Sequence, residues 1–290
     1  MTGEMEWLAH AARPNISIIT TVGPVHLEGL ASVENVAAEK FKLVRALPPE
    51  GTAIVPYANP YLEPLLKECP CRIITFGIEQ GDFRASQING HGENRFRIIS
   101  PAGEQEITLK LPGRHNISNA LAAAAASVSA GASLTDVAEG LSTFTAPKWR
   151  MEILNLGSER ILIRDCYNAN PLSMTAALEV LLERNNGPTL AVIANMAELG
   201  SKAEALHEDL GKQAGEMRIS KFVFIGDFGR FFKKGFVSAG GDVRNMIVVP
   251  DKKAAWDVIR PELKNFSAIL VKGSRRMEME TLVDQILEEN

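Results

Sequence analysis

A histidine and a carboxylate follow the first segment of the chain that reads as a strand. Residues 21–28 run Thr-Val-Gly-Pro-Val-His-Leu-Glu, which places His26 and Glu28 just beyond that segment. Imidazole nitrogen and carboxylate oxygen are both common metal ligands. The alternative is a plain polar loop, and so short a motif favours the loop when it is taken alone.

A lysine interrupts the apolar face of the next helical segment. Lys40 falls among positions that recur at helical spacing, namely Val33, Val36, Ala37, Leu43, Val44 and Leu47. Because a charged amine is costly to bury, either the side chain extends to water or the amine is neutral and has reacted with CO2. A carbamylated lysine would carry a carboxylate that suits magnesium. The pattern alone favours the extended, charged side chain.

Two asparagines and an arginine are further candidates for ligand binding. Residues 111–119, Leu-Pro-Gly-Arg-His-Asn-Ile-Ser-Asn, open a helical segment that Asn116 can cap. Asn116 and Asn119 are neighbours on one helical face, so both can reach a ligand. Arg150 follows the best candidate for a domain boundary and suits bidentate binding of phosphate. A salt bridge between domains is the alternative for Arg150.

Three later loops gather polar side chains after strand-like segments. Their candidates are Asp165, Tyr167 and Asn168 in the first loop, Glu198 in the second, and Lys272, Ser274 and Arg275 in the third. Parallel sheets bind ligands beyond the carboxyl ends of their strands. In the third loop, Lys272, Ser274 and Arg275 suit a carboxylate or phosphate ligand. The alternative for the first loop is an ordinary turn at Asn170-Pro171, and the alternative for the third loop is a solvated basic turn.

The elements that must position these side chains alternate between strand and helix. In the first half, the pattern predicts strands at 16–22, 52–57 and 72–76, helices at 33–47 and about 61–67, and later helices at 117–130 and 134–144. Ser133 is the expected N-cap of the last helix. Between these groups, short strands at 83–89, 95–99 and 104–111 predict a small antiparallel excursion at about 82–111.

The second half reads as a regular series of strands and helices. Strands are expected at 161–165, 189–193, 222–225, 246–249 and 268–271, and helices at 173–184, 203–217, 230–238, 254–259 and 279–287. Continuous apolar strands between helices indicate a parallel sheet covered on both faces. The predicted fold class is α/β, with domains at 1–146 and 147–290. Since no G-x-G-x-x-G follows the first of these strands, dinucleotide binding is disfavoured.

Composition excludes several classes of protein. The chain has 290 residues, 46% hydrophobic and 23% charged, with a net charge of -4 and no long basic run, so a nucleic-acid partner is not expected. No apolar stretch approaches the roughly 20 residues that span a bilayer. The three cysteines, which include the tight pair Cys69 and Cys71, fit a reducing cytoplasm rather than a disulfide framework.

The ordered motifs resemble the MurF branch of the Mur ligase family through nearly the whole chain. They are Gly-Pro-Val-His-Leu-Glu, Pro-Gly-Arg-His-Asn-Ile-Ser-Asn, Arg-Met-Glu, Tyr-Asn-Ala-Asn-Pro-x-Ser-Met, Met-Ala-Glu-Leu-Gly and Leu-Val-Lys-Gly-Ser-Arg. The resemblance implies a partial central ATP-binding domain followed by a Rossmann-like C-terminal domain. It also implies ATP-dependent ligation in the cytoplasm. In the reaction that the resemblance implies, the carboxylate of a UDP-MurNAc-tripeptide would be phosphorylated, and the amine of D-Ala-D-Ala would attack the acyl phosphate.

The resemblance also implies roles for individual residues, with ATP and Mg2+ as cofactors. His26 and carbamylated Lys40 would bind magnesium, and with Arg150, which reaches the ATP phosphates, they would be the catalytic residues in one shared cleft. The nucleotide-binding residues would be Asn116, Asn119, Arg150, Asp165 and Asn168. Glu198, Lys272, Ser274 and Arg275 would face the nucleotide and the incoming dipeptide.

The sequence departs from the family pattern in two ways. No G-x-x-x-x-G-K-[ST] occurs in the chain, so we expect the P-loop upstream, on a longer chain or a separate N-terminal half, and an isolated chain that does not hydrolyse ATP. Five positions are also unusual for the family: Thr21, Trp149, Arg164, Cys166 and Asn195. Of these, Arg164 is expected to alter the charge near the nucleotide. The alternatives are a non-catalytic homologue that binds nucleotide or a partner, and a related Mur or folylpolyglutamate-type ligase.

Overall fold

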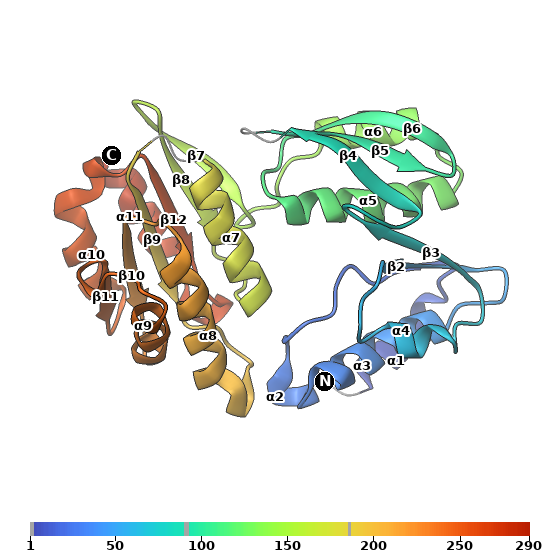
Figure 1. Cartoon of the computed structure of the whole chain (residues 1–290), viewed down its shortest axis with the longest axis horizontal. Coiled ribbons are helices and arrows are strands. Elements are labelled where there is room, and N and C mark those ends of the chain that lie inside the picture. Colours follow the sequence, from blue (N-terminus) through green and yellow to red (C-terminus); the bar gives the residue numbers. More distant parts are fainter. Residues whose placement is uncertain (1–2, 90–92, 185–186) are drawn as a thin grey trace. The chain divides into compact units, whose positions relative to one another are not determined.

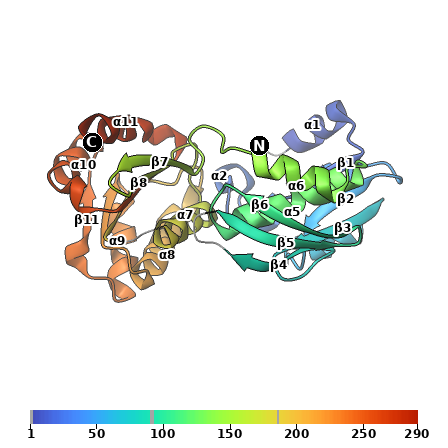
Figure 2. The ribbon, with the colours of Figure 1, turned by 90° about the horizontal axis from the view of Figure 1, so that it is seen from above.

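The computed structural model describes residues 3–89, 93–184 and 187–290, and the chain divides into two compact units, Met1–Thr145 and Ala146–Asn290. Each unit is built around a six-stranded sheet that carries helices (Figures 1 and 2). This is the mixed α/β class that the sequence predicted. The two units are described separately below.

The sheet of the first unit combines parallel and antiparallel strands in the order β1-β2-β3-β4-β5-β6. Its strands are β1 (Ile16–Ile18), β2 (Thr52–Pro56), β3 (Arg72–Gly77), β4 (Phe83–Asn89), β5 (Asn94–Ser100) and β6 (Gly103–Leu109). The first four strands are parallel, and β5 and β6 continue the sheet in antiparallel fashion. The three short strands predicted as an excursion therefore belong to the main sheet, because Phe76 and Gly77 of β3 pair with Phe83 and Arg84 of β4.

The helices of the first unit are α1 (Glu4–Ala12), α2 (Leu27–Leu30), α3 (Val33–Arg45), α4 (Glu63–Leu66), α5 (Arg114–Ser129) and α6 (Leu134–Thr143). The sequence did not predict α1 or α2, since α1 buries only Ala9 and α2 is a single turn. Ile117, Leu121 and Ala124 of α5 pack with the apolar side chains of the sheet. Ser133 caps α6 as predicted, and Asp136 completes a reciprocal capping box.

The sheet of the second unit has the order β11-β10-β9-β12-β8-β7. Its strands are β7 (Glu152–Gly157), β8 (Arg160–Asp165), β9 (Thr189–Ala194), β10 (Lys221–Ile225), β11 (Met246–Val249) and β12 (Ala268–Lys272). Strands β8 to β12 are parallel, as predicted, while β7 pairs antiparallel with β8 at the sheet edge. The sequence missed β7 because Leu156 is its only buried residue, which weakens the apolar pattern of a core strand.

Helices cover both faces of this sheet. They are α7 (Pro171–Glu183), α8 (Ala203–Glu216), α9 (Gly229–Ser238), α10 (Lys252–Ile259) and α11 (Glu280–Glu289), with short 3-10 turns at Gly200–Lys202, Val243–Asn245, Arg260–Asn265 and Arg275–Met277. Ile163, Ile193 and Leu270 pack under α7, α8 and α9. Their strand neighbours Leu162, Val192 and Ile269 pack under α10 and α11. This alternation follows from the two-residue period of a strand.

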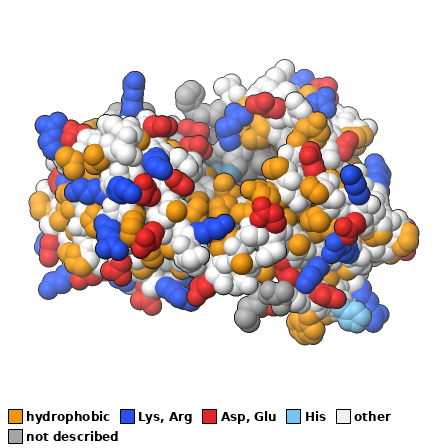
Figure 3. Space-filling model, turned by 60° about the horizontal axis from the view of Figure 1, so that its bottom comes forward, with side chains coloured by type: hydrophobic (Ala, Val, Ile, Leu, Met, Phe, Trp, Pro, Cys, Tyr) orange, Lys and Arg blue, Asp and Glu red, His pale blue; other side chains and the backbone are white. Residues whose placement is uncertain are grey.

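The surface carries charges of both signs. Lysine, arginine, aspartate and glutamate side chains are interspersed across the face drawn in Figure 3. In the parts of the chain that the structure describes, no helix is long and apolar enough to cross a membrane.

Candidate functional site

His26 lies in the loop that leads from β1 to α2. Its backbone is left-handed, with a φ of 53°, and its carbonyl accepts the amides of Gly29 and Leu30 at 3.1 and 3.0 Å. A left-handed conformation is uncommon for a residue other than glycine, so this turn gives the histidine a defined position. The side chain is exposed at the surface of the first unit.

Lys40 is joined to the same loop. Its Nζ donates a hydrogen bond to the carbonyl oxygen of Thr21 at 2.8 Å, and the side chain is half-buried on α3. Burial lowers the pKa of Lys40 below its ordinary value, because desolvation disfavours the charged amine. The structure thus brings Lys40 to the loop that carries His26, and the lowered pKa increases the neutral fraction of the amine, which is the form that reacts with CO2.

Glu39, next to Lys40, is a buried carboxylate that sequence reasoning missed. It is 7% exposed, and its Oε1 accepts the amides of Gly3 and Met5 at the start of α1, while Oε2 contacts Nζ of Lys42 at 2.8 Å. Burial opposes its ionisation, but the bonds from Lys42 and the two amides outweigh that effect and lower the pKa of Glu39. Glu39 therefore ties α1 to α3, because the first amides of a helix lack partners within the helix.

Asn116 and Asn119 lie together in the first turns of α5. The prediction that Asn116 caps this helix was wrong: the helix begins at Arg114, and Gly113 with a φ of 87° precedes it. Asn116 instead donates from Nδ2 to the carbonyl of Pro112 at 2.7 Å, and Asn119 donates to Oδ1 of Asn116 at 3.4 Å. The two amides are thus neighbours on one face, as their spacing predicted.

Buried Asn94 holds the turn that precedes α5. Its Nδ2 donates to the carbonyls of Leu111 and Gly113 at 2.7 and 3.1 Å. The sequence offered no sign of this role, because Asn94 begins a strand that is distant along the chain. Its effect is to fix the entry of the helix that carries both candidate asparagines.

The second unit places its three candidate loops on neighbouring strands. The loops follow β8, β9 and β12, and β12 lies between the other two strands in the sheet. The backbone amide of Ser274 donates to the carbonyl of Asn195 at 3.2 Å, which joins the loops after β12 and β9. The candidates therefore lie together at the carboxyl ends of the parallel strands, where such sheets bind ligands.

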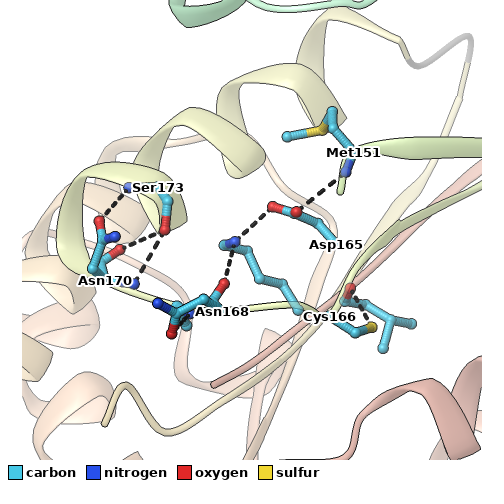
Figure 4. Close-up of polar contacts among 9 residues, drawn as sticks. Met151, Asp165, Cys166, Asn168, Asn170 and Ser173 are labelled. Carbon is cyan, nitrogen blue, oxygen red and sulfur yellow. Dashed lines mark hydrogen bonds and ion pairs between the residues drawn. The ribbon is translucent and has the colours of Figure 1, made fainter. Parts of the chain in front are cut away.

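Asp165 of β8 and Lys272 of β12 are register partners at the carboxyl ends of these strands. Figure 4 shows Asp165 with its hydrogen bond from Met151. Nζ of Lys272 lies 2.6 Å from Oδ2 of Asp165 and donates to the carbonyl of Asn168 at 2.9 Å. Lys272 is 1% exposed and Asp165 is 8% exposed. The two charged groups predicted to contact ligands are thus buried partners of each other, and in this conformation they act on the loops rather than present their charges at the surface.

A strained turn presents Arg150. Its neighbours Trp149 and Met151 both have left-handed backbones, with φ of 66° and 49°. The amide of Met151 donates to Oδ1 of Asp165 at 3.2 Å, and the amide of Trp149 donates to Oε2 of Glu152. The exposed guanidinium of Arg150 stacks over the ring of Tyr167 at 3.8 Å. Arg150 therefore has a defined position and an accessible charge.

Arg164 was expected to alter the charge near the nucleotide, but its guanidinium is paired with Glu152. Its Nε and Nη2 donate to the two carboxylate oxygens of Glu152 at 2.9 and 3.1 Å. The residues are direct partners across the β7 and β8 pair. The positive charge of Arg164 is thus neutralised by Glu152, and the same carboxylate holds the Trp149 amide.

Arg275 and Ser274 follow β12, and they differ in exposure. The guanidinium of Arg275 lies 4.7 Å from the centre of the Trp149 ring and contacts Oε1 of Glu280 at 2.6 Å. Arg275 remains exposed, whereas Ser274 is buried. Arg275 is therefore the group from this loop that is better placed to meet a ligand.

His207 supports the loop that carries Glu198. Its buried ring accepts the amide of Met196 on Nε2 at 3.0 Å, and Nδ1 lies 2.7 Å from the carbonyl of Ala203. Because an amide can only donate and a carbonyl can only accept, the ring is neutral with its proton on Nδ1. Burial lowers the pKa of His207 to about 4. Glu198 itself is exposed, with a left-handed φ of 61°.

Metal-binding side chains are sparse in the described ranges, which hold no group of three or more His, Cys, Asp or Glu residues arranged around a metal. The Sγ atoms of Cys69 and Cys71 are 3.6 Å apart as free thiols. Burial raises the pKa of Cys71 to about 11, which keeps that thiol protonated at neutral pH. His26 and Lys40 remain the candidates for magnesium.

Two family profiles match this architecture in order. The Mur ligase middle domain matches residues 1–127, and the domain described as "Mur ligase, glutamate ligase domain" matches residues 149–275. The chain therefore belongs to the Mur ligase family.

Within that family, similar proteins are UDP-N-acetylmuramoyl-tripeptide–D-alanyl-D-alanine ligases, the MurF enzymes. The Escherichia coli enzyme is 34% identical over 99% of this chain, and the Bacillus subtilis enzyme is 29% identical over 99%. A crystal structure of MurF from Acinetobacter baumannii superposes over 99% of the chain with a TM-score of 0.91 and 29% identity. MurF from Thermotoga maritima in complex with ADP shares the fold, with a TM-score of 0.86 over 100% of the chain and 18% identity.

The chain spans less than two thirds of each of these proteins: 63% of the E. coli enzyme, 62% of the B. subtilis enzyme, 62% of the A. baumannii chain and 65% of the T. maritima chain. His26 and Lys40 lie in the first unit and Arg150 in the second. A cleft shared by the three side chains stays a prediction.

Proposed function

We propose that this chain forms the central and C-terminal parts of a MurF-type ligase. The reaction would join UDP-MurNAc-tripeptide to D-Ala-D-Ala at the expense of ATP, in the cytoplasm. The observation that carries the proposal is that both Mur ligase domains match in order and that 99% of the chain aligns with the E. coli MurF enzyme at 34% identity. The gathering of three polar loops at one sheet edge supports it independently.

The proposed chemistry has two steps. A carboxylate oxygen of the tripeptide attacks the γ-phosphorus of ATP, ADP departs, and an acyl phosphate forms. The D-Ala-D-Ala amine then attacks the acyl carbon, loses a proton and expels inorganic phosphate, which leaves an amide. Charge on the transferring phosphoryl group is the main electrostatic demand of the first step.

Cationic and polar side chains of both units would stabilise the charge on the phosphoryl group and bind the substrates. Arg150 is exposed, stacked and fixed by its turn, so it suits a phosphate oxygen. Asn116 and Asn119 present neighbouring amides that suit the adenine edge. Asn168, Glu198, Ser274 and Arg275 would face the nucleotide and dipeptide. Asp165 and Lys272 would act by holding the loops that carry these groups.

The proposed magnesium ligands fit in part. Lys40 is half-buried with a lowered pKa, which favours carbamate formation, and the Thr21 contact brings it to the loop of His26. A carbamate oxygen and the His26 imidazole would then supply two ligands of the shell. When bound, magnesium would offset negative charge on the transferring phosphoryl group.

We further propose that this chain alone does not hydrolyse ATP appreciably. The sequence holds no G-x-x-x-x-G-K-[ST] to cradle the phosphates, and full-length relatives contain additional residues. Residues that match the remainder of MurF, in the same polypeptide or in a partner, would complete the enzyme.

The test supplies that remainder. The chain is mixed with, and separately fused to, the N-terminal part of the E. coli MurF enzyme that it does not match. ATP, UDP-MurNAc-tripeptide and D-Ala-D-Ala are added, phosphate release is measured, and the product is identified by mass spectrometry. We expect pentapeptide product only with both parts and all three substrates.

Two results would count against the proposal. No product with both parts folded, but with retained ADP binding, would indicate a non-catalytic nucleotide-binding homologue. Turnover of other amino acids or of a folate acceptor in place of D-Ala-D-Ala would indicate a different ligase. Arg276→Met serves as a control variant. It removes an exposed arginine, Arg276, to which we assign no role, and it should leave product formation unchanged.

A further inference from the structure

The turn that presents Arg150 is unfavourable by its own backbone. Trp149 and Met151, on either side of Arg150, both adopt left-handed φ angles that non-glycine residues rarely take. A conformation of this kind persists only when surrounding contacts determine it. The contacts that hold the turn therefore also determine where the guanidinium of Arg150 lies.

Two carboxylates supply those contacts. Glu152 accepts the Trp149 amide and Asp165 accepts the Met151 amide. The backbone amide of Tyr167, in the loop after β8, donates to the Trp149 carbonyl at 3.1 Å, and the Tyr167 ring stacks on Arg150. Each left-handed residue is thus anchored by a side-chain acceptor.

Arg164 orients the Glu152 carboxylate toward the Trp149 amide. Its bidentate bonds at 2.9 and 3.1 Å hold both oxygens of Glu152, and one of these oxygens also receives the Trp149 amide. The pair is largely shielded, with side chains 14% and 20% exposed for Arg164 and Glu152. The bonds from Arg164 and from the Trp149 amide lower the pKa of Glu152 and outweigh the opposing effect of burial. The carboxylate consequently stays ionised at neutral pH.

We propose that Glu152 and Arg164 are positioning residues for nucleotide binding: they hold the Trp149 turn so that Arg150 meets a phosphate group. This rests on the proposed function, which gives Arg150 its phosphate partner. Arg164 and Trp149, two of the five positions that are unusual for the family, then act together, because the ion pair with Arg164 fixes the carboxylate that anchors the Trp149 backbone.

The test measures binding of ADP and of adenosine to the full chain by calorimetry. Arg150→Met should weaken ADP binding about tenfold, the loss of one charge-assisted contact, and leave adenosine binding unchanged. Glu152→Ala and Arg164→Met should produce a similar loss for ADP alone. Glu152→Ala should cause no further loss in the Arg150→Met background, because residues that act through one group are not additive.

A charge swap separates positioning from general stabilisation. The double variant Glu152→Arg with Arg164→Glu can restore the ion pair between β7 and β8, but an arginine at position 152 cannot accept the Trp149 amide. We expect it to recover the thermal stability lost in the single variants without recovering ADP affinity. Glu152→Gln, which keeps an acceptor oxygen, should retain more ADP affinity than Glu152→Ala and serves if the alanine variant does not fold.

Other results of these measurements would contradict the inference. If the swap restores ADP affinity, or if Glu152→Ala weakens ADP binding equally with Arg150 absent, the pair is only structural and the inference is overturned. The same holds if Arg150→Met weakens ADP binding but Glu152→Ala and Glu152→Gln do not, which leaves the proposed function intact. Failure of the unaltered chain to bind ADP, both alone and fused to the N-terminal part of the E. coli MurF enzyme, would instead refute the nucleotide role and the inference with it.

Discussion

Removing the charge of Lys272 alone should destabilise the second unit more than removing the charges of Lys272 and Asp165 together. The pair is buried, with Lys272 1% and Asp165 8% exposed, and Nζ and Oδ2 are 2.6 Å apart. Water cannot easily replace either partner at such a site. Each charge is therefore retained in the fold because the other one is present.

The geometry sets the expected magnitude. Lys272→Met would leave the carboxylate of Asp165 buried with the Met151 amide as its hydrogen-bond donor, which should cost about 3–5 kcal/mol of unfolding free energy. Asp165→Asn would leave a buried ammonium and should cost a similar amount. The double variant has no buried charge, and the new amide oxygen can still accept from Met151. Its loss should be only about 1–2 kcal/mol.

Urea unfolding followed by tryptophan fluorescence measures these free energies. Trp7→Phe serves as the background because Trp149 and Trp256 both lie in the second unit, so the signal reports that unit. The matched control is Lys253→Met, which removes an exposed lysine of the same unit and should change the free energy by less than about 0.5 kcal/mol. If the two single losses simply add in the double variant, Asp165 and Lys272 are not coupled and the reasoning is refuted.

Three further predictions concern other parts of the chain. The second unit should lose up to about 3 kcal/mol between pH 6.5 and pH 4, because His207 has a folded pKa near 4, below its unfolded value, so the unfolded state binds the proton first; urea unfolding against pH measures this. Gly235→Ala should destabilise by more than about 3 kcal/mol in thermal unfolding, since a Cβ would lie 1.9 Å from the carbonyl oxygen of Glu208. Lys40 should show little carbamate by 13C NMR in 13C-bicarbonate when no nucleotide is present, because no bound magnesium then stabilises the carbamate.

Each of these has its own counter-result. A pH profile that stays the same in His207→Gln would show that another group causes the loss. Unchanged stability in Gly235→Ala would mean that α8 and α9 can separate without cost. A full carbamate signal without nucleotide, absent from Lys40→Arg, would contradict the third prediction.

The sequence determined the elements that depend on local pattern. Ser133 and Asp136 form the capping box of α6 because such a cap involves residues three apart. The apolar strands and intervening helices of the second half predicted its parallel sheet, since a strand covered on both faces must be apolar throughout. The rule that ligands bind at the carboxyl ends of strands selected loops that the sheet order makes neighbours.

Tertiary structure decided which of the selected side chains are partners of one another. Lys272 and Asp165 are 107 residues apart, and Glu152 pairs with Arg164 only through the register of the β7 and β8 strands. Charge and spacing cannot distinguish an exposed ligand-binding group from a buried ion pair, because that distinction depends on desolvation and on contacts between distant segments. The left-handed turn at Arg150 also depends on tertiary structure, since the acceptors that stabilise it come from two different strands.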